Sequence, residues 1–191
     1  MSRNDVKLRK DKIKSFKQDI SQMAVLPIRR LPDPVLREQA QEITEVNGEL
    51  QRLIEDMAET MYAAPGLGLA ANQVGVLRRL MVLDVSHRDG GPRDLKVILN
   101  PCITAAEGEI IREEGCLSVA DFAAEVRRHA RVTVTGLDRE GNPLKISGEG
   151  LLAVVIQHEV DHLNGILFID RISRLKRGLY LRRLKKQAAA P

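Results

Sequence analysis

One helical segment limits the folds available to this chain more than any other feature. Residues 150–165, GLLAVVIQHEVDHLNG, predict a helix whose first half is apolar on every side. Such a helix is stable in water only when other elements surround it, so it must lie inside a domain. Gly165 suits the position just past its C-terminus, because glycine readily adopts the left-handed conformation that ends many helices. We therefore expect the rest of the chain to be built around residues 150–165.

Four ionisable side chains lie in this helix: His158, Glu159, Asp161 and His162. His158 and His162 lie one turn apart on one face, where two imidazoles can bind one cation. With Glu159 they form the H-E-x-x-H motif, in which the glutamate is a general base. Because buried unpaired polar groups cost several kcal/mol, the sequence predicts a metal site here. Asp161 is interpreted equally well as a carboxylate that orients a histidine or as a buried structural group.

A catalytic metal site needs a third protein ligand and one open position. His87 and His129 lie in a predicted surface turn and a polar strand edge, so solvated roles are favoured for both. Carboxylates are too numerous to choose among by spacing. Cys116 is favoured as the third ligand because EEGCLS is an acidic, glycine-containing break after an apolar strand. Cys102, in NPCIT, is interpreted as a small core residue.

The remaining segments predict short strands and two further helices. Thr44 is the expected cap of a helix that extends through the early sixties. The other expected features are a Pro-containing turn at 31–37, a Gly-rich loop at 64–75, a strand at 79–86, a turn at 89–94, a strand, turn and strand at 97–119, a hairpin at 130–148 and a basic amphipathic helix at 173–187. The pattern favours an α+β fold with mixed or antiparallel strands around a central buried metal-binding helix and with a C-terminal helix.

The length of 191 residues fits one domain, preceded by a polar, Lys-rich extension at residues 1–22. No apolar run approaches the roughly 18–20 residues that span a bilayer, and the N-terminus lacks a secretory pattern. Two cysteines are too few for a disulfide framework, so free thiols in a reducing compartment are expected. These observations predict a cytoplasmic protein that does not enter a membrane.

Three stretches together resemble the signatures of peptide deformylase. GLGLAANQ (66–73) is similar to Gly-x-Gly-x-Ala-Ala-x-Gln, EGCLS (114–118) to the second signature and QHEVDH (157–162) to His-Glu-x-Asp-His. The similarity begins near Ala24 and ends near Lys186, which leaves residues 1–22 outside it. It implies an α+β catalytic domain at residues 23–191 and an enzyme that removes the N-formyl group from the N-terminal methionine of newly synthesised proteins.

The resemblance also implies a role for each matching residue. The metal ligands would be Cys116, His158 and His162. Glu159 would be the general acid/base for attack by metal-bound hydroxide, while Gln73 and the backbone N–H of Leu117 would hold the oxyanion. Gly68 would lie along the substrate backbone. The pocket for the methionine side chain would be lined by Leu67, Leu151, Val154 and Val155.

The resemblance implies one divalent metal ion, with Fe²⁺ as the natural cofactor, although intrinsic affinity favours Zn²⁺ over Fe²⁺. Zn²⁺, Ni²⁺ or Co²⁺ could replace it in preparations. The expected partners are N-formylmethionyl nascent peptides in a bacterial-type cytoplasm, and the expected state is a monomer. One position departs from the family pattern. EGCLS is followed by Val119-Ala120-Asp121 rather than by a hydrophobic residue and proline, which puts the stiffness of that loop in question.

The C-terminal segment carries seven Lys or Arg residues and no acid between Arg174 and Lys186. Leu175, Leu179 and Leu184 are interleaved with these basic residues. One interpretation is a solvated helix that packs on the domain through these leucines. The other is an electrostatic contact with ribosomal RNA, where a nascent peptide emerges.

Two other classes of protein compete with a deformylase. A zinc peptidase would also carry H-E-x-x-H, but the cysteine-containing signature and the Gly-rich loop with its glutamine argue against it. A binding module with a structural metal site would close the coordination sphere with four protein ligands. Only Cys102 is available as a further cysteine, and Glu159 would have no use there.

Overall fold

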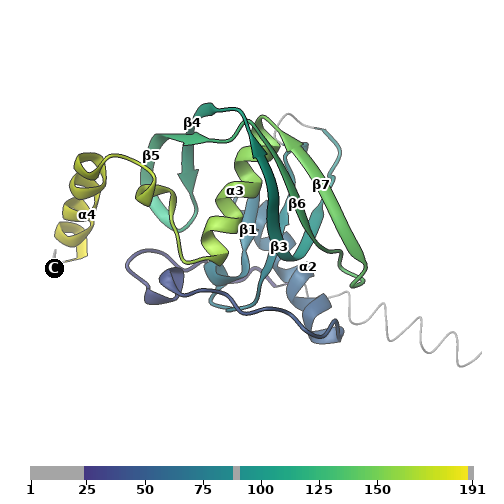
Figure 1. The fold of residues 1–191 in the computed structure, drawn as a ribbon. Helices are drawn as coiled ribbons and strands as arrows, with labels where there is room; N and C mark the ends of the chain where they lie inside the picture. The colour runs from purple at the N-terminus through teal and green to yellow at the C-terminus, as the bar shows by residue number, and fades with distance from the viewer. Residues whose placement is uncertain (1–23, 88–90, 189–191) are drawn as a thin grey trace, which may run out of the picture.

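The computed structural model describes residues 24–87 and 91–188 of the chain. The predicted extension at 1–22 and part of the predicted turn at 89–94 lie outside these residues. In chain order the elements are η1 (Pro34–Arg37), α2 (Gly48–Ala63), β1 (Gly68–Ala70), η2 (Ala71–Val74), β2 (Leu80–Leu83), β3 (Lys96–Glu107), β4 (Ile110–Cys116), β5 (Val119–Arg128), β6 (Arg131–Leu137), β7 (Pro143–Glu149), α3 (Leu151–Leu163), η4 (Phe168–Asp170) and α4 (Arg174–Ala188) (Figure 1).

A five-stranded antiparallel sheet in the order β1-β2-β3-β6-β7 lies between two helices. Successive side chains of a strand point to opposite faces of its sheet. On β2, Met81 and Leu83 belong to the core cluster that contains α3, whereas Leu80 and Val82 belong to the cluster that contains α2. All four residues are buried. The predicted α+β fold, with its antiparallel strands and C-terminal helix, is confirmed.

The segment 97–119 contains the two predicted strands, but they enter different sheets. β3 pairs with β2 and β6, and the chain then turns at Gly108, where φ is +63°. β4 pairs instead with β5 in a separate two-stranded sheet. The sequence pattern does not predict β5, because alanines and Asp121 have low strand propensity and the inward position 128 carries an arginine. Figure 1 shows α3 between the β4–β5 pair and the larger sheet.

Two local predictions are corrected. The cap of α2 is Asn47 rather than Thr44: the side-chain oxygen of Asn47 accepts the Leu50 N–H at 3.0 Å, and the helix begins at Gly48. An N-cap residue must directly precede the first helical residue, and Thr44 lies too far upstream. The segment 64–75, expected to be a loop, contains the short strand β1 and the turn η2.

The buried position of α3 is confirmed, because ten of its 13 residues are buried. Gly165 follows the last turn with φ of +72°, and its N–H donates to the carbonyl of His162 at 2.9 Å. A Cβ at this position would lie 2.5 Å from the carbonyl oxygen of Arg37, so glycine is required there for space as well as for conformation. Neither α3 nor any other helix in the described part of the chain has the length and apolar content to cross a membrane.

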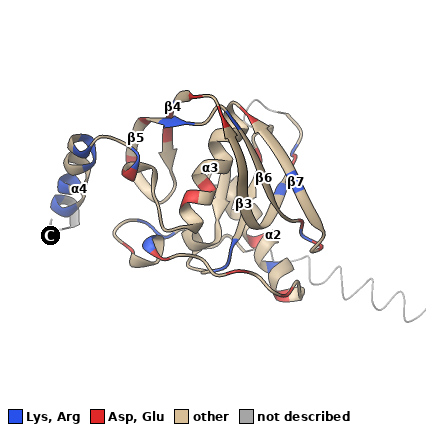
Figure 2. Ribbon diagram, viewed as in Figure 1, with Lys and Arg blue, Asp and Glu red and all other residues tan. Residues whose placement is uncertain are grey.

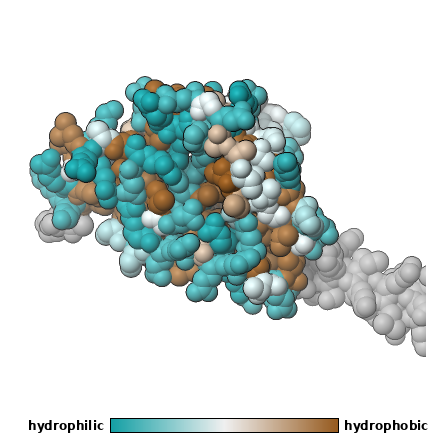
Figure 3. Space-filling model, in the orientation of Figure 1, coloured by the Kyte–Doolittle hydropathy of each residue, from teal (hydrophilic) through white to brown (hydrophobic). Residues whose placement is uncertain are grey.

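The helix α4 lies at one edge of the molecule, beside β5 (Figure 1). Tyr180 is buried and stacks on Phe122 of β5, with ring centroids 4.7 Å apart. Leu184 packs partly against the same cluster. Leu175 and Leu179, however, are 68% and 55% exposed, so of the three leucines expected to pack on the domain only Leu184 does so, and Leu181 packs there as well. Figure 2 shows basic residues along α4, and Figure 3 shows apolar side chains exposed among hydrophilic ones on this part of the surface.

A buried carboxylate joins the ends of α2 and β2. Asp84 is inaccessible to solvent and accepts hydrogen bonds from the Tyr62 hydroxyl at 2.7 Å, the Ser86 hydroxyl at 2.6 Å and the Asp94 N–H at 2.8 Å. Burial by itself would raise the pKa of Asp84, but these hydrogen bonds outweigh burial and hold the pKa well below its usual value. The folded chain therefore stabilises the ionised form of Asp84.

This carboxylate predicts a stability that depends on pH. Asp84 contributes stability above the unfolded-state pKa of about 3.9, and the contribution declines as pH falls from there toward the lower folded-state pKa. We expect Asp84→Asn to lower the free energy of unfolding at neutral pH by about 1.5–3 kcal/mol, with a deficit that shrinks below about pH 4. Urea unfolding of both proteins at neutral and acid pH measures this difference. Asp94→Asn, which removes a carboxylate that is 65% exposed, is the control, and a deficit independent of pH would contradict the prediction.

Candidate metal centre and active site

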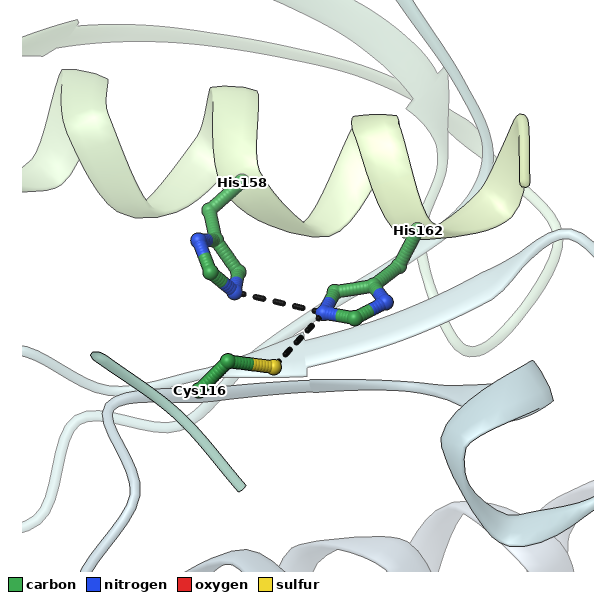
Figure 4. A group of neighbouring side chains, drawn as sticks. All are labelled: Cys116, His158 and His162. Carbon is green, nitrogen blue, oxygen red and sulfur yellow. Dashed lines mark hydrogen bonds between the residues drawn. The ribbon is translucent and has the colours of Figure 1, made fainter. Parts of the chain in front are cut away.

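Three donor side chains converge from two separate elements. His158 and His162 project from the same face of α3 toward Cys116 at the end of β4 (Figure 4). The Nε2 atom of His162 lies 3.2 Å from Nε2 of His158 and 3.1 Å from Sγ of Cys116. Among the described residues, this is the group of cysteine, histidine and carboxylate side chains whose ligand atoms lie close enough together to hold a metal ion. The three predicted ligands are thus brought together.

A buried carboxylate sets the orientation of His158. Oε2 of Glu114 lies 2.8 Å from Nδ1 of His158, and the guanidinium of Arg128 donates to both oxygens of Glu114 at 2.7 and 3.0 Å. Burial alone would raise the pKa of Glu114, but the hydrogen bonds from His158 and Arg128 lower it to about 2. The ionised carboxylate accepts the Nδ1 proton and directs Nε2 of His158 into the site. The contacts with Cys116 and Glu114 outweigh burial and raise the pKa of His158 well above its usual value, so a metal ion bound here would take the place of the Nε2 proton.

His162 is fixed mainly through its backbone. Its carbonyl accepts a hydrogen bond from the side-chain amide of Asn72, a buried residue of η2. Burial lowers the pKa of His162, and the neighbouring His158 lowers it further. The ring is therefore neutral at physiological pH, and Nε2 can donate a lone pair.

The donor set fits a divalent cation. At bond lengths of about 2.0–2.3 Å, two ligand atoms on one tetrahedral ion lie roughly 3.3–3.6 Å apart. The observed separations of 3.1 and 3.2 Å are close to this range. Two imidazole nitrogens and a sulfur also converge on one point, where a cation could replace the protons that they otherwise share. A thiolate with two imidazoles suits zinc and iron better than magnesium or calcium.

Glu159 lies beside these donors in a different environment. Its side chain is buried, and its Oε2 atom has no hydrogen-bond partner among the described residues. Burial raises the pKa of Glu159 to about 7. Gly68 of β1 packs directly against it, because a Cβ built on Gly68 would lie 2.5 Å from Oε1 and 2.8 Å from Cγ. This carboxyl group can therefore both accept and release a proton near neutral pH.

Gln73 points its amide nitrogen into the site. Its Oε1 accepts the Ala70 N–H at 2.8 Å, which orients the side chain. Its Nε2 lies 3.2 Å from the hydroxyl oxygen of Ser118 and 3.7 Å from the sulfur of Cys116. An uncharged N–H donor is thus held next to the donor sulfur, where it can meet a developing negative charge.

The turn after Cys116 is held in place despite the absence of the proline typical of the family. Cys116 pairs with Val119, so only Leu117 and Ser118 connect β4 to β5. The Ser118 N–H donates to the cysteine sulfur at 3.4 Å, and its carbonyl accepts the Leu31 N–H at 3.0 Å. Strand pairing and these two hydrogen bonds fix the path of the turn in the structure.

A cavity of about 370 Å³ opens beside the donor group. Helix α3, the segment around β1 and the end of β4 form its walls. The residues predicted to contact substrate all line it: Leu67, Gly68, Leu151, Val154 and Val155. The cavity is also lined by Gln73, Cys116, Leu117, His158 and Glu159. Of the predicted site residues, only His162 does not line it. The cavity therefore presents an apolar chamber directly next to the polar groups.

Other sequence interpretations fare differently. His129 is exposed, and His87 lies near Asp84 rather than near the site, as expected for residues that are not ligands. Cys102 is exposed on β3, so its interpretation as a core residue is wrong. Sequence reasoning assigned no role to Glu114 or Arg128. The only sequence signal for this pair was the acidic residue inside EGCLS. Arg128 gave no signal, because it meets Glu114 only through the pairing of β4 with β5.

Comparison with known proteins gives one family throughout. The profile of the polypeptide deformylase family matches residues 25–178. The peptide deformylase of Thermodesulfovibrio yellowstonii is 54% identical over 163 residues, which are 85% of this chain and 98% of that protein.

Solved structures agree. A peptide deformylase from Legionella pneumophila is 47% identical, with a TM-score of 0.80, over 88% of this chain and 100% of the other. One from Ehrlichia chaffeensis in complex with actinonin is 38% identical, with a TM-score of 0.82, at the same coverage. These matches favour neither a zinc peptidase nor a structural metal module. The chain belongs to the peptide deformylase family of enzymes.

Proposed function

We propose that this enzyme hydrolyses the formamide bond at the N-terminal methionine of newly synthesised proteins, with Cys116, His158 and His162 as ligands of one divalent metal ion. The observation that carries the proposal is Glu159, a buried carboxyl group with pKa near 7 and a free oxygen, between the donor group and the apolar cavity. All of these residues belong to one chain, which supports action as a monomer. Its place of action would be the cytoplasm, where formylated chains are made.

The bound metal would supply hydrolytic power by lowering the pKa of a water molecule from about 15.7 toward roughly 7 and by polarising the formyl oxygen. Glu159 accepts the proton that this water loses and delivers it to the departing amine. A carboxyl group with pKa near the working pH suits both steps. Its free Oε2 atom is the atom for this transfer.

Two donors from the protein would stabilise the negative charge that develops on the formyl oxygen. Nε2 of Gln73 is held in place by the contact of its Oε1 with the Ala70 N–H. The backbone N–H of Leu117, in the turn after Cys116, is the second donor. One preorganised donor of this type lowers the barrier by on the order of 3 kcal/mol.

The apolar chamber explains the choice of methionine. Leu67, Leu151, Val154 and Val155 line the cavity and match an unbranched thioether side chain in character. Gly68 lies on β1, which is the edge strand of the five-stranded sheet. An extended substrate can pair with such an edge, so its backbone would run along Gly68.

For the metal, we propose Fe²⁺ as the natural ion, with Zn²⁺, Ni²⁺ or Co²⁺ able to occupy the same donors. The mixed sulfur and nitrogen donor set is compatible with each of them. Metal analysis of protein purified without oxygen, combined with activity, identifies the ion. A metal content below one per chain in active protein would contradict this proposal.

The reaction itself is tested with a pair of peptides. We expect release of formate from a formyl-methionyl peptide and no cleavage of the same peptide without the formyl group. Removal of the metal with a chelator should abolish the reaction, and a divalent metal should restore it. Cleavage of an internal peptide bond would instead indicate a peptidase.

We further propose that α4 contacts the ribosome. Its basic residues, none opposed by an acid within the helix, support binding to RNA phosphates, and the exposed Leu175 and Leu179 leave an outward apolar surface on the same helix. Tyr180 faces inward and anchors the helix on Phe122. Among the basic residues of α4, Arg177 pairs with Asp170 at 3.1 Å, whereas Lys176, Arg182 and Arg183 are exposed and have no ion pair among the described residues.

Replacing Lys176, Arg182 and Arg183 by Gln removes three exposed charges and retains Tyr180. We expect at least a tenfold loss of ribosome affinity at low salt, because about three phosphate contacts disappear, with a shallower dependence on salt. Hydrolysis of a short formylated peptide should not change. The matched control replaces three exposed basic residues elsewhere: Arg52, Arg112 and Lys145. Equal co-sedimentation of both triple variants with ribosomes would contradict the proposal.

A further inference from the structure

A network of buried charged side chains extends from His158 to the surface. Its outer residues, Asp161 and Arg171, do not line the cavity beside the donor group. Nδ1 of His158 contacts Glu114, and Arg128 binds both oxygens of Glu114. The same guanidinium donates to Oδ2 of Asp161 at 2.5 Å. Nε and one terminal nitrogen of Arg171 then donate to the two oxygens of Asp161 at 2.5 Å. Asp161 therefore contacts two arginines rather than a histidine.

The four charges balance only when Arg171 is included. The side chains of Glu114, Arg128 and Asp161 are 4%, 2% and 8% exposed, whereas that of Arg171 is 42% exposed. Without Arg171, two buried carboxylates would share one guanidinium. An uncompensated buried charge is costly, so Arg128 would be drawn toward Asp161 and would weaken its two-point contact with Glu114.

We propose that Arg171 is a positioning residue for the metal ligand His158, acting through Asp161, Arg128 and Glu114. By neutralising Asp161 it leaves Arg128 free to hold Glu114 with both nitrogens, and Glu114 fixes the ring and tautomer of His158. This inference rests on the proposed role of His158 as a metal ligand. Arg171 itself touches neither the donor group nor the substrate cavity.

A second cavity lies at the outer end of this network. It allows the proposal to be tested by supplying the missing guanidinium group as a small molecule. It has a volume of about 400 Å³, and Arg128, Asp161 and Arg171 line it together with His129 and Gln157. In Arg171→Ala, a guanidinium ion can enter from this side and donate to Asp161 in place of the missing side chain. Bidentate contact with a carboxylate is the geometry that guanidinium favours.

The experiment measures Co²⁺ binding to the full-length chain, without substrate. Loss of residues that support a metal ligand typically costs about 10–100-fold in affinity, and we expect a value near the lower end for Arg171→Ala because it acts through three intermediates. The visible absorption of the Co²⁺ form should also shift, since His158 changes its orientation. Millimolar guanidinium should restore both the affinity and the spectrum, whereas sodium at the same ionic strength should not.

Arg177→Ala is the matched control. Arg177 is 44% exposed, close to the value for Arg171, and pairs with Asp170 at 3.1 Å. This variant therefore loses an arginine ion pair that does not belong to the network from His158 to Arg171. Its Co²⁺ affinity and spectrum should equal those of the original protein. Equal Co²⁺ binding by Arg171→Ala, or a loss that guanidinium does not restore, would overturn the inference. Absence of Co²⁺ binding by the original protein would instead overturn the proposed metal centre.

Discussion

Glu159→Gln is expected to lower turnover of a formyl-methionyl peptide by at least roughly 10²–10⁴-fold, the usual loss when a positioned proton carrier is removed. The amide has nearly the same shape, so it leaves the donors Cys116, His158 and His162 in place. Metal content and thermal stability should therefore remain close to those of the original protein. Stopped or steady-state assays of formate release, together with metal analysis of the same samples, measure both effects.

His162→Ala provides the contrasting variant, because it removes a ligand and should lose metal and stability together with activity. If Glu159→Gln also loses its metal, then Glu159 is a ligand or holds one in place. If Glu159→Gln retains metal and near-normal turnover, the proposed proton transfer is wrong.

Gly68→Ala is expected to lower turnover on the order of 10²-fold, because displacement of a reacting group by about 1 Å can cost that much. The added Cβ would lie 2.5 Å from Oε1 of Glu159 and 2.8 Å from its Cγ, distances at which the glutamate must move. The three atoms nearest to the added Cβ all belong to Glu159 rather than to a metal donor, so metal binding should persist. Separate values of kcat and KM measure the effect.

The same variant separates two reasons for a glycine at this position. If Gly68 only gives room to the substrate backbone, KM should rise while kcat stays near its original value. A fall in kcat identifies contact with Glu159 as the reason. Gly66→Ala is the control, because its Cβ would meet the flexible end of Leu117 at 3.0 Å, which can move aside, and we expect a much smaller loss.

The sequence was most informative where one short segment contains both the structural and the chemical signal. The first half of residues 150–165 is apolar on every side and predicted a buried helix. His158, Glu159 and His162 share that segment, so their proximity followed from helix geometry alone. Cys116 could be favoured only from its local surroundings and the family resemblance. Its distance from His162 depends on how β4 packs against α3.

Contacts across the fold were beyond reach of the sequence pattern. Glu114 and Arg128 meet because β4 and β5 pair, yet β5 lacks the composition of a typical strand. The close contact between Gly68 and Glu159 likewise forms only when β1 packs beside α3. Asn47 rather than Thr44 caps α2 because the backbone is still extended at Asn47, and the choice among capping residues depends on the surrounding packing.

The division of the donors between α3 and the small β4–β5 sheet gives the metal a mechanical role. An ion held by Cys116 and the two histidines would cross-link the hairpin to the helix and close the long intervening chain into a loop, which reduces the entropy of the opened state. Without the ion, this two-stranded sheet would keep its polar contacts with α3 through Glu114 and Arg128 and its apolar partners such as Phe168 and Tyr180, but it would lose the link through Cys116. Backbone amides of β4 and β5 should then exchange with solvent deuterium faster than those of the five-stranded sheet, so hydrogen exchange would register the loss of metal as local opening of the hairpin.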